Sequence, residues 1–172
     1  MEHLNIEIKA HCADPAAIRA ILREHGADFK GTDHQIDTYF NVPSGRLKLR
    51  EGNIENALIF YERSDQAGPK QSNIMLHQTA PQSDLKPLLT KALGVKVTVD
   101  KSREISFIGN VKFHLDTVAG LGSFVEIEAI DADGSLGRAR LLAQCQEYLT
   151  LFKIQDADLV EGSYSDLLLD LA

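Results

Sequence analysis

The stretch LNIEIK, residues 4–9, alternates apolar and polar side chains with a period of two. This alternation predicts a β-strand with one apolar face and one polar face. Successive side chains of a strand point to opposite sides, so Glu7 and Lys9 share the polar face. An acid and a base are therefore the first candidates for a functional site.

The same alternation recurs along the chain and predicts a domain rich in short strands. Further strands are expected over residues 34–42, 46–50, 57–63, 72–79, 95–108, 112–118 and 123–130. Helices are expected over residues 15–24, 84–94, 135–152 and 164–171, with Asp14-Pro15 as an N-cap followed by proline at the first helical position. About eight strands with three or four helices predict an α+β barrel or sandwich. Neither a repeat nor a linker is visible, so residues 1–172 are expected to form one domain.

The composition of the chain limits the kinds of molecule that it is expected to bind. The chain has 172 residues, 44% of them apolar, and a formal net charge of −7. An acidic chain is a poor candidate for binding nucleic acid or an anionic membrane. There is no long apolar run and no secretory signal, and Cys12 and Cys145 form no CxxC pair. We therefore expect a cytoplasmic protein with reduced thiols that binds neither nucleic acid nor membrane.

Acidic residues gather in the last two predicted strands. Glu126 and Glu128 are two apart and share one face, and Asp116 ends the preceding strand, just before Gly120-Leu121-Gly122. Two neighbouring carboxylates repel each other unless a cation neutralises them, and Mg²⁺ and Mn²⁺ prefer oxygen ligands. The cluster indicates a divalent metal site. The alternatives are a solvated strand face and, for Asp116, a cap on the following turn.

Basic residues form two alternating pairs. Lys48 with Arg50, and Lys101 with Arg103, each place two cations on one strand face. Such pairs are unfavourable unless an anion lies opposite, and a polyphosphate would fit because guanidinium groups match phosphate oxygens. Pairing with the acidic cluster, or a surface position, is the alternative. Periodicity alone leaves open whether the charged faces point into a barrel or out to solvent.

The sequence resembles the CYTH family, also called triphosphate tunnel metalloenzymes, across nearly its whole length. The similar segments are NIEIKA (5–10), HQIDTYF (34–40), GRLKLR (45–50), KSR (101–103), HLD (114–116), GLGSFVEIE (120–128) and GSYSDLL (162–168). The resemblance implies an eight-stranded antiparallel closed barrel with helices packed outside and a hydrophilic tunnel within. It selects the arrangement in which the charged faces point inward.

The resemblance also implies an enzyme that acts on a triphosphate with Mg²⁺ or Mn²⁺. Metal ligands would be Glu126 and Glu128, with Asp116 and Glu7 nearby. Phosphate contacts would come from Lys9, Lys48, Arg50, Arg63, Lys101 and Arg103, with Lys70 as a further candidate. Glu7 would orient the attacking water, and Lys9 would contact the transferred phosphate. A monomer or homodimer is expected.

One position departs from the family signature ExExK, because its first glutamate is replaced by Asn5. Asparagine can offer a carbonyl oxygen but no charge, so a second metal would be the first loss. Three functions therefore stay open: hydrolysis of a terminal phosphate of tripolyphosphate, thiamine triphosphate or a nucleoside triphosphate; cyclisation of ATP to cyclic AMP and pyrophosphate; and binding without turnover. Cyclisation would need a nucleoside pocket, for which Tyr39, Phe40 or Tyr61 could supply a stacking ring.

Overall fold

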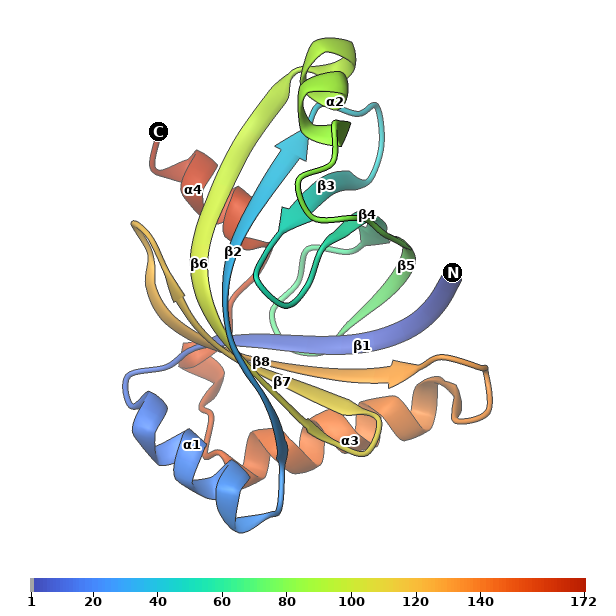
Figure 1. The fold of residues 1–172 in the computed structure, drawn as a ribbon. Coiled ribbons are helices and arrows are strands. Elements are labelled where there is room, and N and C mark those ends of the chain that lie inside the picture. Colours follow the sequence, from blue (N-terminus) through green and yellow to red (C-terminus); the bar gives the residue numbers. More distant parts are fainter. Residues whose placement is uncertain (1) are drawn as a thin grey trace.

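The computed structural model describes residues 2–172, which form a closed antiparallel barrel (Figure 1). Around the barrel the strands follow the order β1-β5-β4-β3-β2-β6-β7-β8, and β8 pairs with β1. The strands are β1 (Glu2–His11), β2 (Asp28–Phe40), β3 (Arg46–Glu51), β4 (Ala57–Arg63), β5 (Lys70–Gln78), β6 (Val95–Ile108), β7 (Val111–Val118) and β8 (Gly122–Asp131). The α+β fold and the closed eight-stranded antiparallel barrel implied by the family resemblance are confirmed.

The helices lie outside the strands; two of them join consecutive strands, and the other two follow the last strand. Their bounds are α1 (Pro15–Glu24), α2 (Leu85–Leu93), α3 (Gly137–Leu151) and α4 (Tyr164–Asp170), with a short 3₁₀ turn over Asp156–Asp158. Asp14 caps α1 as expected, because its side chain accepts a hydrogen bond from the backbone N–H of Ala17 at 3.2 Å. None of the described helices is long and apolar enough to cross a membrane.

The apolar faces of β1, β7 and β8 point outward and are covered by α1 and α3. Ile6 and Ile8 of β1 are 1% exposed, and Ile127 of β8 is fully buried. Ile18 of α1 and Leu141 of α3 pack into the same cluster. Figure 1 shows both helices beneath this part of the barrel. Because the helices bury the outer face, the polar face of these strands has to point inward.

A second apolar cluster lies inside the barrel, next to α4. Val99, Val118 and Phe124 come from the strands, and Tyr164 comes from the first turn of α4. Phe124 and Tyr164 pack edge to face with ring centroids 5.0 Å apart. This cluster fills the interior beside α4, and several of its members also line the polar cavity.

One strand is longer than the alternation predicts. The second strand was expected to begin at residue 34, but β2 begins at Asp28. Its first part pairs with β6 only, since pairing with β3 starts at Ile36. Most of residues 28–32 are exposed, so this part has no buried apolar face and shows no period-two signal.

Candidate functional site

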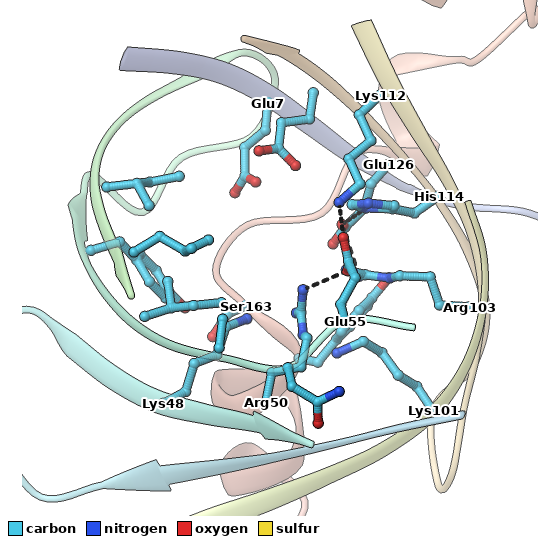
Figure 2. Close-up of a pocket in the computed structure, with 18 of the residues that line it drawn as sticks. Glu7, Lys48, Arg50, Glu55, Lys101, Arg103, Lys112, His114, Glu126 and Ser163 are labelled. Atoms are coloured by element: carbon cyan, nitrogen blue, oxygen red, sulfur yellow. Dashed lines mark hydrogen bonds and ion pairs between the residues drawn. The ribbon is translucent and has the colours of Figure 1, made fainter. Parts of the chain in front are cut away.

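The barrel encloses a cavity of about 500 Å³ whose lining is strongly charged on most sides. Figure 2 shows the labelled side chains around this space; most come from the strands, Glu55 comes from the β3–β4 connection and Ser163 directly precedes α4. The charged lining residues are Glu7, Lys9, Lys48, Arg50, Glu55, Arg63, Lys101, Arg103, Lys112, Glu126 and Glu128. The sequence-predicted acids and bases, except Asp116 and Lys70, therefore face one common cavity.

Three carboxylates lie side by side on β1 and β8. Glu7 is directly opposite Glu128 in the strand register, and Glu126 lies on the same face of β8, opposite Lys9. Two acids in opposed positions destabilise a sheet unless a cation lies between or beside them. Arg63 pairs with Glu7, and the side-chain amide of Asn5 donates to Glu128 Oε1 at 2.6 Å. The opposed pair Glu7 and Glu128 is therefore held by one cation and one amide.

Glu126 is the most heavily partnered of the three. Its oxygens lie 3.0 Å from Lys9 Nζ, 3.1 Å from a terminal nitrogen of Arg103 and 2.8 Å from His114 Nδ1. Burial would raise the pKa of this carboxyl, but Lys9 and Arg103 outweigh burial and hold the pKa well below its usual range. Burial and the nearby Arg103 lower the pKa of His114. Glu126 is thus an ionised carboxylate beside a neutral imidazole at neutral pH.

The donor chemistry of this group fits a hard divalent cation. Within residues 2–172, no three His, Cys, Asp or Glu side chains already form a converged metal site. Glu7, Glu126 and Glu128 nevertheless offer carboxylate oxygens from adjacent positions, which is what Mg²⁺ and Mn²⁺ prefer. Asn5 is fully buried, and its carbonyl oxygen has no hydrogen-bond partner in the described part of the chain. An unpaired buried oxygen beside Glu128 is a further donor for a cation.

Asp116 is buried and is not among the residues that line the cavity. Both of its oxygens accept from Arg103, at 2.8 and 2.7 Å, and one also accepts from the Tyr164 hydroxyl at 2.7 Å. In the strand register Asp116 faces Phe124, while His114 faces Glu126. Asp116 therefore holds the guanidinium of Arg103 in place under the carboxylates. Its predicted role as a metal ligand stays a prediction.

The predicted basic wall exists, and it already carries a counterion. Asp37 of β2 is fully buried and lies 3.1 Å from Lys48 Nζ, 2.9 Å from Arg50 and 2.7 Å from Lys101 Nζ. Burial would raise the pKa of Asp37, but these three cations hold it well below its usual range. Burial in turn lowers the pKa of Lys101. The alternative of pairing within the barrel is therefore met in part. Lys48, Arg50 and Lys101 share Asp37, which was not in the predicted acidic cluster. Arg103 instead pairs with Asp116 and Glu126, which were.

The β3–β4 connection brings a fourth glutamate into the cavity. Buried Asp33 accepts hydrogen bonds from the backbone N–H groups of Asn53, Ile54 and Glu55 at 2.6, 2.9 and 2.9 Å. Glu55 then pairs with Lys112 and, at 3.3 Å, with Arg50 (Figure 2). An anionic substrate that uses Arg50 competes with both Asp37 and Glu55.

Arg63 and Lys70, the two other predicted phosphate contacts, differ in whether they reach the cavity. Arg63 lines the cavity beside Glu7, as expected from the family resemblance. Lys70 is not among the cavity-lining residues, and its ammonium donates to the carbonyls of Val160 and Gly162 at 3.1 and 3.2 Å. Lys70 thus ties the segment before α4 to β5. Burial, with the neighbouring cations, lowers its pKa to about 8.

Of the three aromatic candidates for stacking, Tyr39 and Tyr61 line the cavity and Phe40 does not. Phe40 follows Tyr39 in β2 and so points to the other face, where it is 2% exposed. Tyr164, which the periodicity did not single out, lies with its ring 3.7 Å from Lys9 Nζ. The ring holds Lys9 beside the carboxylates.

The functional residues that sequence reasoning missed are mainly acids that organise the bases. Asp33 and Asp37 lie on the same strand face as Tyr39, in the segment DHQIDTY (33–39). The rule that grouped Lys48 with Arg50 would have placed Asp33 and Asp37 together on one strand face, although not the cations that they contact. Glu55 lies in a loop, and no periodic pattern could have shown that it points inward.

Comparison with known proteins agrees with this geometry. The CYTH domain family matches residues 3–164, so the chain belongs to the CYTH family. No curated protein matches it in sequence. Among solved structures, PH1012 from Pyrococcus horikoshii is 22% identical, with a TM-score of 0.79 and coverage of 95% of this chain and 98% of that one.

Two other solved structures bear descriptions of activity. A candidate adenylate cyclase from Vibrio parahaemolyticus is 19% identical, with a TM-score of 0.79 over 96% of this chain and 98% of that one. HpAC1 from Hippeastrum, described as a candidate adenylyl cyclase with a dominant triphosphatase activity, is 12% identical, with a TM-score of 0.60 over 97% and 94%. At these identities the likeness shows a shared fold.

Proposed function

We propose that this protein is a divalent-metal-dependent enzyme that binds a triphosphate inside the barrel and hydrolyses its terminal phosphate. The observation that carries the proposal is the division of one cavity into two charged regions. Glu7, Glu126 and Glu128 gather on β1 and β8, and a lysine–arginine wall runs across β3 and β6. A metal–triphosphate complex carries charge of both signs and matches both regions.

The basic wall supplies the phosphate contacts. Lys48 and Arg50 approach from β3, and Lys101 and Arg103 approach from β6, with Lys9 and Arg63 nearer the carboxylates. Buried cations that share the carboxylate of Asp37 are pre-oriented, so little reorganisation is needed when phosphate oxygens arrive. Asp116 holds Arg103 in a bidentate geometry, in which Nε and one terminal nitrogen of the guanidinium each donate to one carboxylate oxygen.

Glu7, Glu126 and Glu128 would hold the metal, with the free carbonyl oxygen of Asn5 as a further donor. Bound there, Mg²⁺ or Mn²⁺ would supply neutralisation of phosphate charge and polarisation of a phosphoryl oxygen. Glu7, which is paired with Arg63, would orient the attacking water. Lys9, fixed between Glu126 and Tyr164, would donate to the transferred phosphate.

Phosphorus NMR of the purified protein tests the proposal. Tripolyphosphate, ATP and thiamine triphosphate are each incubated with Mg²⁺ and then with Mn²⁺. Release of orthophosphate that requires the metal is the expected result. Broadened substrate lines without product under both metals would show a binding module instead, and unchanged lines with every compound would exclude this site for triphosphates.

Cyclisation of a nucleoside triphosphate is the second candidate. Tyr39 and Tyr61 line the cavity beside Lys48, whose ammonium lies 5.4 and 5.6 Å from their ring centroids. Aromatic rings next to a phosphate-binding cation could orient a nucleoside. In the same spectra, pyrophosphate together with a cyclic-phosphate signal from ATP would establish this reaction.

A further inference from the structure

The wall of the cavity formed by β4 and β5 differs chemically from the rest of the lining. Ala57 and Ile59 face the cavity from β4, and Ile74 and Leu76 face it from β5. Ile59 is directly opposite Leu76, and Tyr61 is directly opposite Ile74, so these side chains form one continuous surface. We call Ala57, Ile59, Ile74 and Leu76 the apolar wall.

Strand β5 reverses the pattern of the strands that the helices cover. In β1 the apolar side chains point outward under α3 and the polar ones point inward. In β5 the outward residues Asn73, Met75 and His77 are exposed, while Ile74 and Leu76 point into the barrel and are only partly buried. Polar residues at Ile74 and Leu76 would therefore leave the outer packing intact. A partly exposed apolar surface that faces a charged cavity is a typical lining for the apolar part of a ligand.

The apolar wall continues directly into the phosphate-binding wall. On β3, Lys48 is the strand neighbour of Ile59, and Arg50 is the strand neighbour of Ala57. A molecule whose phosphates lie against Lys48 and Arg50 therefore has apolar surface within reach of its other end. The cavity volume of about 500 Å³ is within the range of roughly 300–1,000 Å³ that is usual for pockets of organic ligands.

We propose that the substrate is an organic triphosphate, whose non-phosphate group packs against Ile59, Ile74 and Leu76, rather than inorganic tripolyphosphate. The proposal rests on the proposed function, because it assumes that the basic wall binds a triphosphate. A bare tripolyphosphate carries no apolar surface, so the apolar wall would contribute nothing to its binding. An organic group removes that surface from water and gains affinity in proportion to the area buried.

Calorimetric titration with Mn²⁺ present compares three probes: tripolyphosphate, ATP and thiamine triphosphate. At least one organic triphosphate is expected to bind roughly tenfold more tightly than tripolyphosphate. Ile74→Ala is expected to weaken binding of that compound by roughly tenfold and to leave the Kd of tripolyphosphate unchanged. Leu76→Asn, which keeps the branched shape of the side chain but makes it polar, serves as a second variant, with the melting temperature as a check on folding.

Met75→Ala is the matched control, because Met75 lies on the same strand, is 56% exposed and points away from the cavity. Met75→Ala should change neither the affinity for the organic triphosphate nor the affinity for tripolyphosphate. Tripolyphosphate binding as tightly as both organic compounds, or Ile74→Ala and Leu76→Asn weakening all probes equally, would overturn this inference and leave the proposed function standing. Failure of all three probes to bind would instead refute the proposed function and the inference with it.

Discussion

The three carboxylates Glu7, Glu126 and Glu128 differ in how many structural contacts they make. An effect of substitution on metal binding can therefore be distinguished from an effect on stability. Glu126 contacts Lys9, Arg103 and His114, so its removal would leave the buried ammonium of Lys9 without its carboxylate partner. Glu128 has a neutral partner in Asn5 and lines the same cavity. Glu128 is therefore the better position for a test of metal binding.

Glu128→Gln is expected to lower metal-dependent turnover by at least about 100-fold, since even outer partners of metal ligands are worth 10–100-fold. The melting temperature without metal should change little, because the amide of glutamine can still accept from Asn5. Turnover and thermal unfolding are measured together. Glu147→Gln on the exposed face of α3 is the control, and full activity of Glu128→Gln would remove Glu128 from the metal ligands.

Asn5→Glu restores the first glutamate of the ExExK signature and tests whether its absence limits binding of a second metal. A fourth carboxylate would lie buried beside Glu128, where Asn5 now donates a hydrogen bond. Without metal we expect the free energy of unfolding to fall by about 1–3 kcal/mol. With Mn²⁺ the variant should regain stability, and its turnover should exceed that of the parent if a second metal is limiting.

Denaturation of Asn5→Glu with and without Mn²⁺ measures this coupling. Asn5→Gln, which adds length but no charge, is the matched control. If Mn²⁺ stabilises the variant no more than the parent, the carboxylate at this position does not reach a metal.

Strand β2 supplies the counterion on which the basic strands β3 and β6 depend. Asp37 contacts cations from both neighbours, so it joins three strands through charge as well as through backbone hydrogen bonds. An internal carboxylate of this kind keeps Lys48, Arg50 and Lys101 together when no substrate is bound. A triphosphate that binds these three cations has to displace the carboxylate of Asp37 from them.

Asp37→Asn is expected to lower the free energy of unfolding by about 3–5 kcal/mol, because it leaves buried cations uncompensated. Because the pKa of Asp37 is depressed in the folded state, its contribution is full above the unfolded pKa of about 4 and is lost as pH falls through the folded pKa. The difference between parent and variant should therefore shrink below about pH 4. Urea denaturation from pH 3 to pH 7 measures it.

Asp100→Asn on the outer face of β6 is the control for that experiment. Its carboxylate is 53% exposed, and its contact is the exposed His34, so a change within about 0.5 kcal/mol is expected. Tripolyphosphate should restore more stability to Asp37→Asn than it adds to the parent. A variant as stable as the parent would show that Asp37 is not the main counterion of the wall.

In the molecule as a whole, packing divides into an outer core under α1 and α3 and an inner core beside α4. Cys145 of α3 is fully buried in the outer core, and its thiol donates to the carbonyl of Ile6 at 3.4 Å. Burial raises the pKa of this thiol to about 12 and also raises the pKa of Cys12. Neither cysteine is placed as a reactive thiol.

Cys145 should therefore react with a thiol reagent at pH 8 only through opening of α3 from the barrel. The labelling rate is expected to rise with urea in parallel with unfolding followed by circular dichroism. Cys145→Ala assigns the signal, because Cys12 remains in that variant. Rapid labelling of Cys145 in the native protein would show that α3 opens independently of the barrel.

The alternation of apolar and polar residues was sufficient to locate most of the strands and the two-faced character of LNIEIK and VEIEA. Side-chain period in a strand is a local property, so Glu126 and Glu128 could be paired without a structure, as could Lys48 and Arg50. The family resemblance added barrel closure and the inward direction of the charges. The start of β2 escaped prediction because its first residues have one partner strand and no buried face.

Contacts between distant segments could be learned only from the folded chain. Three such contacts depend on the order and register of the strands. Asp37 pairs with three cations, Asp116 pairs with Arg103, and Glu55 reaches the cavity from a loop and pairs with Lys112. The apolar wall likewise depends on which face of β4 and β5 points inward. Local periodicity gives the two faces of a strand, whereas barrel closure and helix packing determine which face meets water, because burial is a property of the whole fold.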